Sequence, residues 1–127
     1  MANKRLDESL GTVGYDNLFV ENVPEADVVA VKLAASQGVL ARGTVVSGTP
    51  GGEDFAALAA AAEATKAIYV LADEVDTGTS GAVVGIAYRT GHFNRAALAV
   101  KTEYTLTAAD EEILRGKGIL VSDALEY

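Results

Sequence analysis

The segment from Val83 to Ile119 constrains the fold of this chain more than any other part of the sequence. It begins with an apolar run, Val83 to Tyr88, that is typical of a strand, and Gly91 follows where we expect a tight turn. A second apolar segment, Phe93 to Val100, comes directly after this turn. The pattern therefore predicts a hairpin built from residues that carry almost no reactive groups.

A short helix is predicted after this hairpin. Thr107 and Asp110 are spaced as a capping box, in which each side chain bonds the backbone amide of the other residue. We expect the helix to run to about Arg115 and to end at the two glycines that follow it. Residues Ile119 to Val121 are apolar and β-branched in part, and they predict a closing strand.

Three further strands are predicted elsewhere in the chain. Valine-rich residues Asp27–Leu33 and Val39–Val46 suggest two of them, joined by a turn at Ser36 to Gly38. Residues Ile68–Ala72 suggest the third. Helix propensity and charge order favour a helix over Glu53–Lys66, although a loop stays open as the alternative for this alanine-rich stretch. We find neither a repeat of fixed period nor a second domain.

The first 23 residues differ from the rest of the chain. Glycines interrupt them, and their apolar side chains follow no sustained helical or strand period. We expect an arm that orders against a partner by strand addition, with an ordinary edge strand of the same domain as the alternative. The chain then divides into an arm, residues 1–23, and one domain, residues 24–127. The apolar anchors of this arm are Leu10, Val13, Tyr15, Leu18 and Phe19.

Composition excludes several classes of partner. The 127 residues carry 18 acidic and 10 basic side chains, a net charge of −8, which disfavours binding to nucleic acid. There is no cysteine, so disulfides and thiolate metal sites are ruled out, in keeping with assembly in a reducing cytoplasm. Residues 1–10 lack an apolar leader, and the longest apolar run, Phe55–Ala62, is too short to span a bilayer. We expect a soluble chain without a membrane partner.

No catalytic, cofactor or metal site is predicted. His92 is the only histidine, and we interpret it as a turn or interface residue at the hairpin. The acidic stretch Asp73–Gly78 looks like the start of a calcium loop, but valine occupies the third ligand position. The glycines from Gly78 to Gly81 are followed by a strand and no lysine, so they do not form a phosphate-binding loop.

Five short motifs stand out in the chain: Tyr88 to Asn94, Leu114 to Ile119, Gly38 to Val45, Ile68 to Asp76 and Ser9 to Leu18. These motifs resemble the head decoration proteins of tailed bacteriophages, the lambda type. The likeness covers most of the chain from about Val31 onward and is weaker between Ser47 and Lys66. At the N-terminus, a further segment resembles the same family in bacterial prophages.

The resemblance implies a fold and a partner. The fold is mainly β, a β-clip or bent-ribbon partial barrel with one or two short helices and an extended N-terminal arm. Such a protein is made in the host cytoplasm and forms a homotrimer on the outer surface of the expanded virion capsid. There it cements the lattice of a major capsid protein with an HK97-type fold, and the arm pairs with strands of that protein.

The resemblance also implies a structural protein that catalyses no reaction and holds no cofactor. Two other classes of function stay open from the residues themselves. A small acidic β domain that binds a carbohydrate or another small ligand would be a monomer with a ligand groove. An enzyme would need a cleft with perturbed titratable groups, and the sequence offers few candidates for one.

Overall fold

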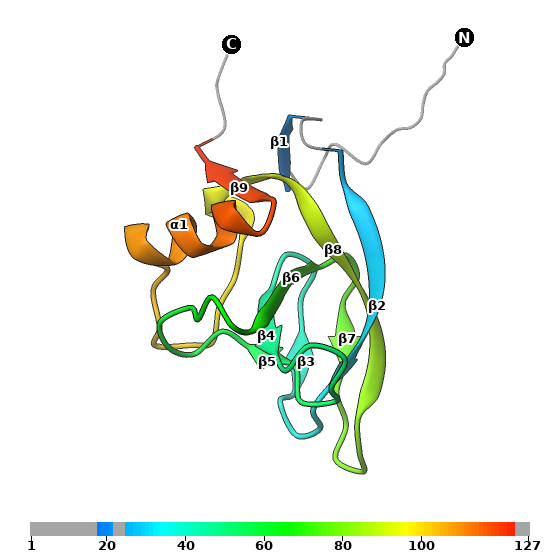
Figure 1. Cartoon of the computed structure of the whole chain (residues 1–127). Coiled ribbons are helices and arrows are strands. Elements are labelled where there is room, and N and C mark those ends of the chain that lie inside the picture. Colours follow the sequence, from blue (N-terminus) through cyan, green and yellow to red (C-terminus); the bar gives the residue numbers. More distant parts are fainter. Residues whose placement is uncertain (1–17, 22–24, 124–127) are drawn as a thin grey trace, which may run out of the picture.

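The computed structural model describes residues 18–21 and 25–123, which form a mainly β domain with open sheets (Figure 1). This confirms the predicted fold class, a partial barrel that does not close. The strands are β1 (Phe19–Glu21), β2 (Asp27–Leu33), β3 (Val39–Leu40), β4 (Val45–Gly48), β5 (Ala56–Ala57), β6 (Ala67–Leu71), β7 (Val75–Asp76), β8 (Val83–Asn94) and β9 (Ile119–Ser122). The helical elements are a 3-10 turn, η2 (Arg95–Ala97), and the helix α1 (Ala108–Gly116).

The long strand β8 is the centre of the sheet. At Ala87 and Tyr88 it pairs with β2 along one edge and with β6 along the other, both antiparallel. At His92 and Phe93 it pairs with β1 in an antiparallel ladder and with β9 in a parallel one. Four strands therefore pair with β8. Figure 1 shows β2 and β8 as a curved ribbon along one side of the domain.

Strands β4 and β6 separate two apolar cores. Val45 and Val70 point into one core and Val46 and Leu71 point into the other, and all four are fully buried. Successive side chains of a strand face opposite sides, so pairs of apolar neighbours bury both faces of this sheet. The helix-side core contains Leu18, Val45, Leu58, Ile68, Val70, Phe93, Leu114 and Ile119. The ribbon-side core contains Val31, Leu33, Leu40, Val46, Phe55, Leu71 and Ala87.

A buried carboxylate fastens α1 to two other segments. The predicted capping box is confirmed, because the Thr107 hydroxyl accepts from the Asp110 amide at 3.1 Å and the Asp110 carboxylate accepts from the Thr107 amide at 3.0 Å. Asp110 also accepts from the Ala62 amide at 2.8 Å and from the Tyr104 hydroxyl. Burial raises the pKa of Asp110, but these hydrogen bonds outweigh burial and hold the pKa below its usual 3.8.

The helix that propensity favours over Glu53–Lys66 is absent; the segment is a loop that contains the short strand β5. Phe55 and Leu58 are buried in different cores, which a helix could not achieve because three residues apart they would share one face. The Gln37 side chain also accepts a hydrogen bond from the Ala57 amide at 3.0 Å. Tertiary contacts thus override the helix propensity of the alanines.

Two predicted strand boundaries are wrong. β8 continues through Gly91, where a turn was predicted, because Gly91 pairs there with Ile119 of β9. The predicted strand Val39–Val46 is interrupted between β3 and β4. Gly43 causes this break: its φ is +94°, and a Cβ at this position would lie 2.6 Å from the carbonyl oxygen of Ala97.

The buried carboxylate yields a pH prediction. The pKa of Asp110 is lower in the folded chain than in the unfolded chain, so its contribution to stability is complete above about pH 5 and is lost as the pH falls through the lowered folded pKa. We expect Asp110→Asn to lower the free energy of unfolding by about 2 kcal/mol at pH 7, because the carboxylate accepts charge-assisted hydrogen bonds.

Urea unfolding of both proteins between pH 7 and pH 2.5 measures this effect. The deficit of the variant should shrink as the pH falls below the folded pKa of Asp110. A deficit that is the same at every pH would contradict the assignment.

Candidate functional site

The N-terminal part of the chain joins the domain at a small three-stranded sheet. This sheet consists of β1, the last residues of β8, and β9, and Figure 1 shows it beside α1 at one end of the domain. Leu18 precedes β1 and is only 2% exposed, because its side chain packs in the helix-side core. Its carbonyl oxygen accepts from the Asn94 amide at 2.7 Å. The chain is therefore fastened to β8 by packing and by a backbone hydrogen bond.

Three aromatic rings pack together beneath β1. The Phe19 ring lies 4.9 Å from Tyr88, edge to face, and 4.9 Å from Phe93 in a tilted arrangement. Gly91 makes room for this cluster, since a Cβ at its position would lie 2.9 Å from the Phe93 ring and 3.1 Å from the Phe19 ring. The Arg42 guanidinium lies over the Tyr88 ring, 5.6 Å from its centroid, and donates to the Tyr88 hydroxyl at 3.1 Å.

Polar contacts fasten β9 on the other edge of β8. His92 was predicted as a turn or interface residue; it lies in β8, so the turn is wrong and the interface role stays a prediction. Its Nε2 lies 2.7 Å from the Ser122 hydroxyl. Arg95 donates to both carboxylate oxygens of Glu111, at 2.7 and 2.8 Å, and to Asp123 at 2.6 Å. Two hydrogen bonds raise the pKa of Arg95, the larger effect coming from Glu111 and the smaller from Asp123. Arg95 therefore remains a cation. These contacts hold β9 against α1 and η2.

The five predicted anchor residues divide into two groups. Leu18 and Phe19 belong to the folded domain. Phe19 lies in the edge strand β1, and an edge strand of the same domain was the alternative to an arm for this part of the sequence. Leu10, Val13 and Tyr15 lie outside the described residues. The capsid-binding role of all five, and the arm boundary at residue 23, remain predictions.

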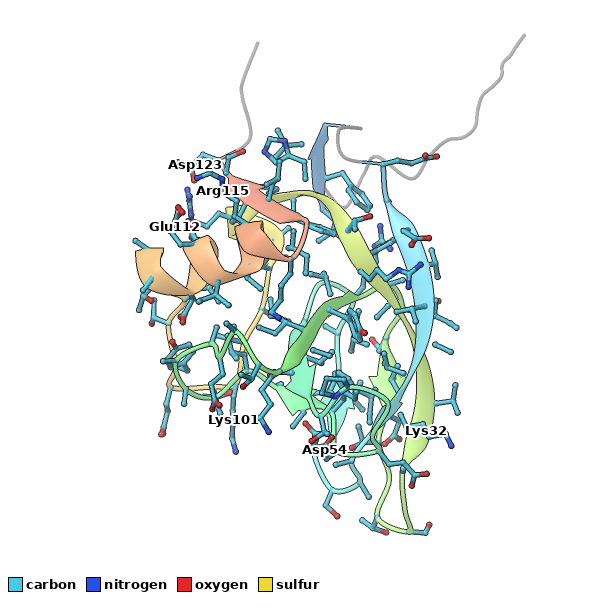
Figure 2. All side chains as sticks on the ribbon, viewed as in Figure 1. Lys32, Asp54, Lys101, Glu112, Arg115 and Asp123 are labelled. Atoms are coloured by element: carbon cyan, nitrogen blue, oxygen red, sulfur yellow. The ribbon has the colours of Figure 1, made fainter. Side chains whose placement is uncertain are left out.

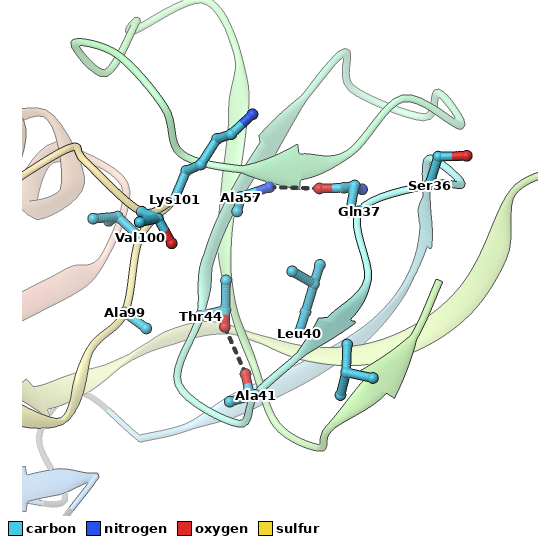
Figure 3. Close-up of a pocket in the computed structure, with 11 residues that line it drawn as sticks. Ser36, Gln37, Leu40, Ala41, Thr44, Ala57, Ala99, Val100 and Lys101 are labelled. Carbon is cyan, nitrogen blue, oxygen red and sulfur yellow. Dashed lines mark hydrogen bonds between the residues drawn. The ribbon is translucent and has the colours of Figure 1, made fainter. Parts of the chain in front are cut away.

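A groove of about 530 Å³ lies on the domain among residues 36–44, Ala57 and 99–102 (Figure 3). Two segments form its walls, one around β3 and one after η2, and its floor includes Thr44 and Ala57. Its lining is mostly small and aliphatic, with Gln37 and Lys101 as the longest polar side chains. The residues that line it are Ser36, Gln37, Val39, Leu40, Ala41, Thr44, Ala57, Ala99, Val100, Lys101 and Thr102.

The acidic stretch Asp73–Gly78 contains the short strand β7, and the glycine-rich residues Gly78 to Gly81 connect β7 to β8. Asp76 lies at the end of β7, and its carboxylate accepts from the Gly78 amide at 3.0 Å. Within the described part of the chain, no three histidine, aspartate or glutamate side chains are grouped so that they could hold a metal ion. Nor is any helix there both long and apolar enough to cross a membrane.

Comparison with known protein families places most of the chain in one of them. The family described as Bacteriophage lambda head decoration protein D matches residues 11–119, which is most of the chain. The chain belongs to this head decoration family. Its role is therefore to decorate a phage capsid, a structural role that places it in the virion and implies a protein without catalytic activity. No individual curated protein matches the chain.

Sequence reasoning missed the contacts that hold this end of the decoration protein together. Arg95 stands beside Asn94 in an apolar stretch, and its partners Glu111 and Asp123 are 16 and 28 residues away. No local pattern links residues at such separations. The Gly91 motif did carry a signal, but the signal was for close ring packing and we interpreted it as a turn.

Packing at Gly91 yields a stability prediction. We expect Gly91→Ala to lower the free energy of unfolding by about 2 kcal/mol, because the added methyl group collides with the Phe93 and Phe19 rings and φ at this position is +152°. Gly116→Ala is the matched control, since nothing lies within 4 Å of a Cβ at that position. Urea unfolding of both variants gives the comparison, and an equal effect of the two would refute the packing role of Gly91.

Proposed function

We propose that this decoration protein forms a homotrimer on the outer surface of an expanded phage capsid and cements the lattice of the major capsid protein. Membership of the head decoration family carries this proposal. The domain supports it through its small size and its open sheets, since its buried side chains are divided between two small apolar cores. A domain of this size gains stability when it associates with other subunits.

In this proposal the capsid-binding arm is residues 1–23, as predicted, and the part of it before Leu18 contacts the capsid. Leu10, Val13 and Tyr15 supply its apolar anchors, and its backbone adds a strand to a sheet of the major capsid protein. Leu18 and Phe19 serve at the base of the arm, where they fasten it to β8. A force on the arm is then resisted by the buried packing of Leu18 in the helix-side core, and not by a surface loop.

Cementing follows from differential binding. A protein that binds only the expanded lattice stabilises that lattice by mass action, by about 4 kcal/mol when its free concentration is a thousand times its dissociation constant. Three arms on one trimer act together, so one arm that detaches rebinds before the other two release. Weak strand additions thus give slow dissociation of the whole trimer.

The role of the arm is tested with full-length protein. We expect the combined substitutions Leu10→Ser, Val13→Ser and Tyr15→Ser to reduce binding to undecorated mature capsids at least a hundredfold, because they remove the apolar anchors and leave the backbone intact. Cosedimentation with capsids measures the binding, and the temperature at which the capsids open measures cementing.

The matched control replaces polar residues of the same segment, Asn3→Ser, Thr12→Ser and Asn17→Ser, and should bind as the parent protein does. Unchanged binding of the first variant would refute the assignment of the arm. Because both variants keep Leu18 and Phe19, their unfolding in urea should match that of the parent protein.

A further inference from the structure

The outer face of the β2–β8 ribbon is apolar. The large apolar side chains that the described residues expose are Val28, Val39, Val84 and Ile86, at 53%, 58%, 60% and 38% exposure. Three of them lie on this ribbon: Ala30 pairs directly with Ile86, and Val28 and Val84 lie two residues away on the same face. We name these residues, Val28, Ala30, Val84 and Ile86, the apolar ridge.

The apolar ridge is electrically neutral in a strongly acidic chain. Arg89 pairs with Asp27 at 2.5 Å near one end, and Lys32 pairs with Glu53 at 3.4 Å near the other. The whole chain carries a net charge of −8, so two copies repel one another over most of their surfaces. The electrostatic free energy of bringing two copies into contact is lowest where the contacting face is neutral and apolar.

The fourth exposed side chain, Val39, stands at the groove shown in Figure 3. No residue of β2 or β8 lines this groove, so it is a separate surface from the ridge. Figure 2 shows the same separation, with Lys32 on the β2 side of the domain and Lys101, a groove residue, well away from it. At about 530 Å³, the groove has the size of a small-ligand pocket and has room for several aliphatic side chains.

The charges around the two surfaces permit this contact. Lys101 makes no ion pair with any residue that the structure describes, and the Asp27 and Glu53 carboxylates at the ends of the ridge are each paired with a cation, at 51% and 64% exposure. A ridge seated in the groove therefore places a neutral apolar face, and no second acidic surface, beside the groove and its lysine. The same seating buries Val39 together with the three large side chains of the ridge, so one contact covers all four exposed apolar residues.

We propose that the apolar ridge of one copy packs into the groove of the next copy, which makes the subunit contact heterologous. Such contacts use two different faces of each subunit, and they close into a ring when the rotation from one subunit to the next is a whole fraction of a turn. A ring of three would leave no ridge and no groove unfilled. This inference rests on the proposed homotrimer and names the surfaces through which it assembles.

Crosslinking tests the contact directly, because the chain contains no cysteine. One preparation carries Val39→Cys and another carries Val84→Cys; the two are mixed and treated with a short bis-maleimide. We expect a crosslinked pair of chains from the mixture, at least tenfold more than from either preparation alone. A mixture of Ala60→Cys with Val84→Cys should give no more than the separate preparations, since Ala60 is exposed but lies outside both surfaces.

Crosslinking of Val84→Cys to itself would overturn the proposal, because it would indicate a symmetric ridge-to-ridge contact. Efficient crosslinking within one chain between Val39→Cys and Val13→Cys at every dilution would also overturn it. That result would show that the groove holds the N-terminal segment of its own chain.

Light scattering separates failure of this inference from failure of the proposed function. The parent protein should have three times the 13.1 kDa mass of the chain, and so should Ala60→Lys. Val84→Lys and Val39→Lys place a charge in the contact and should raise the concentration needed for assembly at least tenfold. A monomeric parent protein would refute the trimer itself, whereas trimeric lysine variants would refute only the ridge and the groove.

Discussion

The backbone ladder along β8 is the interaction on which the rest of the structure depends. It holds β2 and β6 at its middle and β1 and β9 at its end, so segments far apart in the sequence share one strand. Both apolar cores are built against this arrangement, with Phe93 in one and Ala87 in the other. The base of the proposed arm, the apolar ridge and the closing strand β9 all take their positions from β8.

Much of this fold could be predicted from local pattern. The capping box at Thr107 and the strand Asp27–Leu33 have the bounds that the residues indicate, because both features are encoded by neighbours in sequence. The helix over Glu53–Lys66 was wrong for the opposite reason. Its conformation is decided by Phe55 and Leu58, which are buried in different cores that other segments build.

The candidate site was less predictable than the fold. Residues Leu18 and Phe19 look like the neighbouring anchors of the proposed arm, and only their packing against Phe93 and Asn94 places them in the domain. The ridge had a signal that sequence reasoning did not use. Strand β2 is apolar on both faces, with Val28 and Ala30 outward and Val31 inward, a pattern expected when both faces meet a protein surface.

In the proposed account, this decoration protein acts through two adhesive regions. The arm binds the capsid, while the ridge and groove of the described domain join copies to one another. The division separates two requirements: subunit assembly needs apolar contact between like-charged chains, and capsid binding needs backbone groups that add to another protein's sheet.

Electron cryomicroscopy of decorated capsids tests this account most directly. The account predicts knobs of three copies, with the chain before Leu18 extended as an added strand in the major capsid protein. Knobs of single copies, or an N-terminal segment folded back on its own domain while the capsid is bound by another surface, would contradict it.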